Sequence, residues 1–341
     1  MNRGTPIILW TLAAALPGGC GTQELLLGTR GSYLFTTVDA LATPGQEVDL
    51  RAQFRSGDFL RGSPGYAVRF YRDGAIWKVA ETDSEGTASV SFTPAAPGDY
   101  EFTAVLAPVG LAEEPPEPRK LLVACRPPDT PIVVVDLDKT VVASGFHTVL
   151  VGTPEPMPDS QAVLKRLAET HAIVYLTHRP DYLSIRTKDW LRQQGYPGGV
   201  VLLSTTGGFL KGSGEFKSAM LADLKKRFGR IEIGIGDKVS DAQAYRQNGL
   251  RTFLLLPPPP QATPEAYEAL AESLQPLDDQ VQVVGDWRQI QDVLFGGATF
   301  GRSAMQQRLR KLAESARQAA TRGASQGASS GVQGDAGRAA P

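Results

Sequence analysis

The pattern of hydrophobic and polar positions divides the chain into an all-β part and a following α/β part. Up to about residue 128, short segments alternate apolar and polar side chains between turns rich in Gly, Pro and Asp. This alternation predicts half-buried strands, and their spacing is typical of a β-sandwich, which we expect over residues 21–128. The expected strands are QEVDLRAQF, YAVRFYRDG, AIWKVAET, TASVSFTP, DYEFTAVL and KLLVAC.

Two details refine the prediction for this β part. The dipeptide Asp73-Gly74 stands between two strand segments and favours a tight hairpin. The segment APGDYEFTAVL resembles the approach to a late strand of an immunoglobulin-like domain, which makes Tyr100 a structural hydrogen bonder more than a ligand contact. We find no catalytic constellation here and expect an immunoglobulin-like sandwich.

Prolines in EEPPEPRK and RPPDTP mark the passage into the α/β part. Over residues 129–299, apolar strands alternate with amphipathic helices, which predicts a doubly wound parallel sheet. The expected strands are PIVVVDLD, HAIVYLTH, GGVVLLS, IEIGIGD, TFLLLP and VQVVGDW. Residues 300–341 are expected to form one exposed helix, SAMQQRLRKLAESARQAATR, followed by a disordered tail rich in Gly, Ala and Ser.

The first twenty residues have the pattern of a secretory signal. Arg3 precedes the apolar run IILWTLAAAL, and small residues then lead to Cys20. This resembles a bacterial lipoprotein signal, which implies acylation of Cys20 and an exported, membrane-anchored protein facing the periplasm or the cell surface. Pro17 and Gly18 depart from that signal, and ordinary cleavage or an uncleaved anchor are the alternatives, although the run is short for a membrane span.

The second cysteine, the charge balance and the hydrophobic content give three further expectations about the chain. Cys125 is expected to be a small buried hydrophobic residue, with a bridge to Cys20 as the alternative. Lys and Arg number 35 against 36 Asp and Glu, so the charge gives no reason to expect nucleic acid as a partner. With 341 residues, 42% of them hydrophobic, the chain can bury more than one core.

Polar side chains gather where the expected parallel strands end. Carboxyl ends of such strands meet at one edge of the sheet, so these side chains are expected to share a pocket. They are Asp136, Asp138, Thr177, Asp237 and Asp241, with Lys217 at the start of a following helix.

These residues resemble the motifs of haloacid dehalogenase-like (HAD) phosphatases over residues 131–256. DLDKT matches the first motif, Thr177 the second, Lys217 the third and GDKVSD the fourth. The resemblance implies a phosphomonoester hydrolase in which Asp136 attacks phosphorus and forms an aspartyl-phosphate. Asp138 then serves as general acid for the leaving group and as base for water.

A cation is needed because two carboxylates facing a phosphate dianion repel it. Mg²⁺ is expected, held by Asp136, Asp237 and the backbone carbonyl of Asp138. Asp241 either joins through water or serves as a charge at a helix N-terminus.

Thr177 and Lys217 are expected to stabilise the phosphoryl oxygens. Lys211 is the alternative to Lys217, and Lys217 is preferred because it begins a helical pattern. Thr140 is expected to steady the turn after Asp136. Lys139 stands where similar phosphatases often have glycine, a departure that leaves the charge and shape of the entrance open.

A closer resemblance is to the LNS2 domain of lipin-type phosphatidate phosphatases and some phosphatidylinositol-transfer proteins. The gaps between motifs leave no room for a cap domain, which suits a bulky or surface-embedded substrate. The matching residues, mostly packing and turn positions, are Thr187, Trp190, Leu191, Gly195, Pro197 and Gly199. Trp190 is expected in the core. His178 and Arg179 are expected either at the rim of the pocket or in a solvated loop, and His147 is a weaker candidate.

Three functional hypotheses follow. The favoured one is a Mg²⁺-dependent phosphatase, tethered at Cys20, acting on a phospholipid such as phosphatidate or on another phosphomonoester. The alternative is a non-catalytic module that senses a lipid head group, which loss of Asp138 or Lys217 would have favoured. In the third, the sandwich serves adhesion, although no residue in it argues for this.

Overall fold

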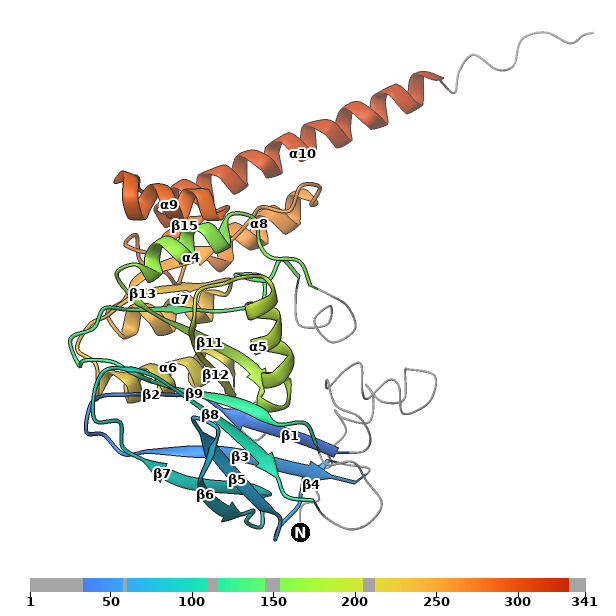
Figure 1. Ribbon diagram of the computed structural model, residues 1–341. Helices are drawn as coiled ribbons and strands as arrows, with labels where there is room; N and C mark the ends of the chain where they lie inside the picture. Colours follow the sequence, from blue (N-terminus) through green and yellow to red (C-terminus); the bar gives the residue numbers. More distant parts are fainter. Residues whose placement is uncertain (1–32, 58–59, 109–115, 145–153, 205–211, 331–341) are drawn as a thin grey trace, which may run out of the picture. The chain divides into compact units, whose positions relative to one another are not determined.

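A computed structural model describes residues 33–57, 60–108, 116–144, 154–204 and 212–330, and side chains as far as residue 322 (Figure 1). The chain divides into two compact units, residues 1–232 and 233–341. Cys20 and the expected signal segment lie outside the described residues, as do Lys211 and His147.

The N-terminal strands form two sheets. The first sheet has the order β1-β3-β4, and β7 also pairs with β3; its strands are β1 (Tyr33–Val38), β3 (Val48–Ser56), β4 (Arg61–Gly62) and β7 (Thr87–Phe92). The second has the order β2-β9-β8-β5-β6, from β2 (Ala40–Ala42), β9 (Arg119–Cys125), β8 (Gly98–Leu106), β5 (Ala67–Arg72) and β6 (Ala75–Glu81). All six expected strands are present, whereas β1, β2 and β4 were not predicted.

Both sheets bury side chains in one hydrophobic core. Phe35 of β1 and Phe54 of β3 belong to it together with Phe70 of β5 and Phe102 of β8. Phe102 is packed between aromatic rings, with centroids 5.3 Å from Trp77 and 4.9 Å from Phe92. The alternation read from the sequence therefore corresponds to inward and outward faces of two packed layers.

Two local predictions for this region are confirmed. Asp73 and Gly74 have φ values of 52° and 80° and join β5 to the antiparallel β6, as a tight turn with two left-handed residues requires. The Tyr100 hydroxyl donates a hydrogen bond to the carbonyl of Ala96 at 2.8 Å, so Tyr100 is a structural hydrogen bonder. Cys125 is buried and free.

The α/β part contains a parallel sheet. Its order is β12-β11-β10-β13-β14-β15, and the pairs β10/β11, β11/β12, β13/β14 and β14/β15 are parallel. The strands are β10 (Ile132–Val135), β11 (Ala172–Pro180), β12 (Gly199–Ser204), β13 (Ile231–Gly236), β14 (Arg251–Leu255) and β15 (Gln282–Val284). All four residues of β10 are buried, as expected for an interior strand covered on both faces.

Helices follow most of these strands, as the alternating pattern predicts. They are α4 (Ser160–Ala168), the short 3₁₀ helix η1 (Asp181–Leu183), α5 (Ser184–Gln193), α6 (Ser213–Lys225), α7 (Val239–Gln247), α8 (Pro264–Ser273), α9 (Trp287–Gly296) and α10 (Arg302–Ser330). Within the described part of the chain, no helix combines the length and the apolar character that crossing a membrane requires.

Helix α10 differs from its prediction in two ways. It was expected to be an exposed helix, but Met305, Leu309 and Ala313 are buried, because apolar residues spaced by four share one face of a helix. This face packs against α8, and Figure 1 shows the two helices next to each other. It also continues through Ser330, into the segment that was expected to be disordered.

The shared aromatic core should dominate the stability of the two N-terminal sheets. Replacing Phe102 by Ala should lower the free energy of unfolding by about 3–5 kcal/mol, since it removes a large side chain and leaves a cavity. Urea unfolding followed by tryptophan fluorescence measures this change. The exposed Val79 is the control, and Val79→Ala should change stability by less than about 0.5 kcal/mol.

Candidate active site

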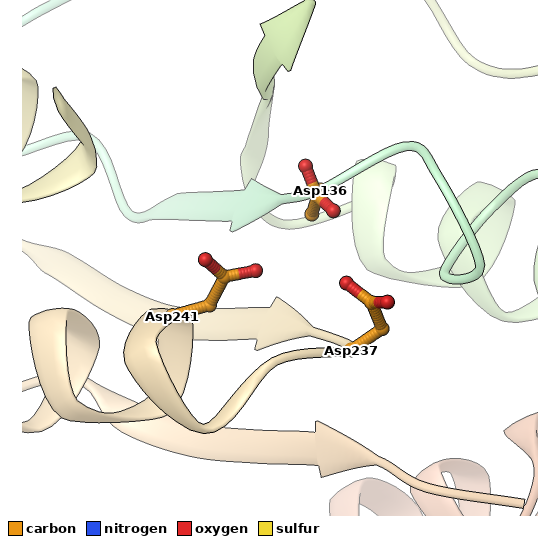
Figure 2. Close-up of side chains that lie close together, drawn as sticks. All are labelled: Asp136, Asp237 and Asp241. Carbon is orange, nitrogen blue, oxygen red and sulfur yellow. The ribbon is translucent and has the colours of Figure 1, made fainter. Parts of the chain in front are cut away.

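Three carboxylates come together where strands of the parallel sheet end. Asp136 directly follows β10, Asp237 directly follows β13, and Asp241 lies in the first turn of α7. One carboxylate oxygen of each lies within 4.8 Å of the others, and Figure 2 shows the three side chains turned toward one another. Asp136 and Asp241 are buried and Asp237 is half-buried.

This cluster fits a divalent cation that prefers oxygen ligands. In an octahedral Mg²⁺ site with Mg–O distances of about 2.1 Å, neighbouring oxygens lie about 3 Å apart and opposite ones about 4 Å apart. The three oxygens, which lie within 4.8 Å of one another, would have to move closer together to bind one ion. Hard carboxylate oxygens without sulfur or imidazole suit Mg²⁺ better than Zn²⁺.

Local packing explains how Asp241 reaches the end of β13. A Cβ atom on Gly236 would lie 2.9 Å from the Cβ of Asp241, closer than real Cβ atoms approach. Gly236 therefore allows the first turn of α7 to pack against the strand end. This position also leaves the alternative role of Asp241 open, since a carboxylate in the first turn interacts favourably with the helix dipole.

Lys217 forms a buried ion pair with Asp136. Its Nζ lies 3.0 Å from Oδ1 of Asp136, and the two side chains are only 1% and 5% exposed. A pair this deeply buried persists because each charge compensates the other in a poorly solvated place. The structure thus brings the expected third-motif lysine to the expected first-motif aspartate.

Asp138 does not join the carboxylate cluster with its side chain. Its two oxygens instead accept hydrogen bonds from Arg179, at 2.8 Å from Nη2 and 3.0 Å from Nε. Such a two-point contact is geometrically specific and stronger than a neutral hydrogen bond. Arg179 also donates from Nη1 to the hydroxyl of Thr187 at 3.1 Å.

The burial of Arg179 corrects the sequence-based expectation. Arg179 was expected at the rim or in a solvated loop, but only 3% of it is exposed. The reason is an irregularity in β11, whose pairing with β12 shifts register between Thr177 and Pro180. A bulge of this kind redirects side chains next to functional sites, and here the Arg179 side chain reaches Asp138.

The remaining expected residues lie around the same strand ends. Thr177 is buried, and its hydroxyl accepts a hydrogen bond from the backbone N–H of Arg179 at 3.3 Å. Thr140 is buried and its N–H donates to the carbonyl of Leu137, closing the turn after Asp136. His178 is half-buried with its ring 5.7 Å from that of Phe216.

Lys139 has a backbone conformation that explains why glycine is common at this position in similar phosphatases. Its φ is 55°, in the left-handed region that costs most residues energy and glycine almost none. Having lysine in place of glycine therefore puts a strained backbone conformation between Asp138 and Thr140.

A second arginine, Arg186, lies near Arg179. Arg186 of α5 is partly buried, and its pKa is lowered from the usual value by burial and, secondarily, by the neighbouring charge of Arg179. Arg179 was one candidate for the rim of the pocket, but its pairing with Asp138 was not predicted. Arg186 was missed because it occupies no recognised motif position. Asp138 compensates the charge of Arg179, so Arg186 adds the further positive charge on this side.

Comparison with known proteins gives one family match. Residues 133–254 match the family model described as "PITM 1-3, LNS2 domain". The match supports an LNS2-type, phosphatase-related domain. It covers the strand ends at Asp136, Thr177 and Asp237 as well as Lys217. No curated protein sequence matches the chain.

Solved structures resemble the chain only weakly. The RNA repair complex Pnkp1/Rnl/Hen1 gives a TM-score of 0.34 at 17% identity, covering 37% of this chain and 43% of that one. Fibronectin(III)-like modules of CbhA from Clostridium thermocellum give 0.20 at 17% identity, covering 27% and 97%. A sialyltransferase from Photobacterium damsela gives 0.23 at 9% identity, covering 80% and 52%. This chain spans less than half of the repair-complex chain.

The residues that carried the LNS2 resemblance have packing roles. Trp190 is buried, and its indole N–H donates to the carbonyl of Pro154 at 2.8 Å. Thr187 and Leu191 are buried on the same helix. The carbonyl of Pro197 accepts a hydrogen bond from Tyr175 at 2.8 Å. These contacts confirm that Trp190 belongs to the core.

The Lys217/Asp136 pair can be tested by a double-mutant cycle. Lys217→Met should lower the free energy of unfolding by about 3–5 kcal/mol in metal-free buffer, since it leaves the Asp136 charge buried and unpaired. Adding Asp136→Asn should recover a large part of that loss. Urea unfolding of the four proteins measures the coupling, and additive effects would contradict a direct pair.

The strained backbone at Lys139 predicts a stability difference between two small substitutions. Lys139→Gly should be more stable than Lys139→Ala by about 1 kcal/mol, because only glycine adopts a φ of 55° without steric cost. Both variants lose the same charge, so thermal or urea unfolding isolates the backbone effect. Equal stability of the two variants would argue against the strain.

Proposed function

We propose that the α/β part is a HAD-type, Mg²⁺-dependent phosphatase of the LNS2 kind that hydrolyses a phosphomonoester through an aspartyl-phosphate. The observation that carries this proposal is Asp136, held in a fixed, buried position at the end of β10 by Lys217 at 3.0 Å. The family match over residues 133–254 supports the same conclusion.

In the first step, an oxygen of Asp136 attacks phosphorus while the bond to the leaving oxygen breaks. Lys217, whose Nζ lies 3.0 Å from Asp136, and the hydroxyl of Thr177 on the neighbouring strand β11 are proposed to neutralise or bond the phosphoryl oxygens. Asp136 and Asp237 would hold Mg²⁺, with Asp241 next to them, and the bound ion would supply compensating positive charge. The backbone carbonyl of Asp138 is proposed as a further ligand.

Asp138 is proposed to protonate the leaving oxygen and later to take a proton from the attacking water. Both of its oxygens bond to Arg179 here, so the pair has to separate before Asp138 can exchange a proton. A phosphate dianion entering the pocket competes with Asp138 for the Arg179 guanidinium. Substrate binding and release of the acid are therefore coupled in this proposal.

We propose a phospholipid such as phosphatidate, or another phosphomonoester, as the substrate. The chain segments between the proposed motifs leave no room for a covering domain, and the LNS2 match supports a lipid-related role. Export with a lipid anchor at Cys20, contact with a membrane surface and an immunoglobulin-like N-terminal sandwich belong to the same proposal.

A second candidate is a non-catalytic module that binds a lipid head group. The observation in its favour is the ion pair of Arg179 with Asp138, which engages the proposed general acid. In this case anionic vesicles should bind the protein, and Asp136→Asn should bind them equally well.

Phosphate release is the direct test of the enzyme. The protein should release phosphate in the presence of Mg²⁺, and Asp136→Asn should lose activity by about a thousandfold or more, since the nucleophile is removed. The assay compares phosphatidate in mixed micelles with soluble phosphomonoesters. Asp223→Asn, which alters an exposed aspartate on α6, is the control and should keep full activity.

The outcomes separate the possibilities. If no phosphate release depends on Asp136, the phosphatase proposal is wrong and the binding-module proposal remains. Release from soluble esters alone overturns the lipid substrate and retains the enzyme.

A further inference from the structure

The segment after β11 is attached to the N-terminal sheet by an ion pair. Arg55 of β3 donates from Nη1 and Nη2 to the two oxygens of Asp181 in η1, at 3.2 Å and 3.1 Å. The two side chains are only 12% and 15% exposed, so water competes little for them. A two-point contact of this kind fixes the orientation of both partners as well as their distance.

A second ion pair acts on the helix that follows. Asp39, between β1 and β2, lies 2.5 Å from Nζ of Lys188 on α5. The Asp39 carboxylate also accepts from the N–H of Leu122 at 3.0 Å and from the N–H of Val201 at 3.2 Å. This buried carboxylate therefore joins β9, α5 and the edge strand β12.

The two ion pairs hold the segment from Asp181 to Lys188, which directly follows Arg179 in the chain. Asp181 follows Arg179 by two residues, and Arg179 holds Asp138 through both carboxylate oxygens. Both η1 and α5 also pack against β1 of the N-terminal sheet. The N-terminal sheet thereby constrains the end of the bulged strand β11 at the point where the Arg179 side chain turns toward Asp138.

We propose that Arg55 is a positioning residue for the site, which acts through Asp181 to hold Arg179 against Asp138. Asp39 and Lys188 secure the other end of the same segment. The proposal rests on the proposed phosphatase function for its effect on turnover. It makes the N-terminal sheets part of the scaffold of the site, in contrast to a separate adhesion or binding module.

The positioning role predicts a selective loss of turnover. In the full-length protein, Arg55→Gln should lower kcat for phosphate release about tenfold, because misplacement by about 1 Å costs one to two orders of magnitude. KM should change less than about threefold, since Arg55 touches no substrate. Arg55→Lys keeps the charge without the two-point contact and should fall between wild type and Arg55→Gln.

Two further variants exclude a general folding effect. Arg51→Gln alters an exposed ion pair on the same strand, with side chains of Arg51 and Asp49 that are 57% and 43% exposed, and should leave kcat unchanged. Exchanging the charges, with Arg55→Asp and Asp181→Arg together, should restore kcat to within about threefold of wild type if pairing is what matters.

Hydrogen exchange separates this proposal from the phosphatase itself. Amide exchange at Arg179, Asp181 and Leu183 should be at least about tenfold faster in Arg55→Gln than in Arg51→Gln, whether or not the protein has activity. If wild type releases no phosphate, the phosphatase fails while exchange still decides the positioning role. Exchange equal to that of Arg51→Gln overturns the positioning role, and so does unchanged kcat in an active enzyme.

Discussion

The buried ion pair of Lys217 with Asp136 is the constraint on which the site depends. Neither charge would be stable alone in so little solvent, so the end of strand β10 and the N-terminal part of helix α6 have to lie next to each other. The fully buried valines of β10 make that possible because they fix the strand within the sheet. The apolar strand and the carboxylate at its end therefore act together, because the packing of the strand sets the position of the charge.

Much of this arrangement is predictable from the sequence because the signals are local. Continuous apolar runs indicate buried parallel strands, and polar residues at their ends indicate where a pocket forms. Lys217 is found by the helical pattern that begins beside it, and Asp237 by the strand before it. The hairpin at Asp73 and Gly74 follows from two adjacent residues that tolerate left-handed conformations.

What the sequence does not reveal depends on long-range geometry. The Arg179 side chain points toward Asp138 because β11 has an irregularity between Thr177 and Pro180. The residue types in HRPD do not predict this irregularity. Arg55 and Asp181 are separated by 126 positions, and each resembles an ordinary surface charge when read alone. The buried face of α10 depends on its contact with α8, a partner that the pattern along the chain does not identify.

The carboxylate cluster also fixes the electrical state of the pocket. Three carboxylates and the Lys217 ammonium leave a net formal charge of minus two, whereas Asp138 and Arg179 cancel each other. The carboxylate cluster by itself would therefore repel a phosphate dianion, and a divalent cation bound there would neutralise it. Under the proposed function, the charge of the carboxylates therefore has to be neutralised before the substrate enters the pocket.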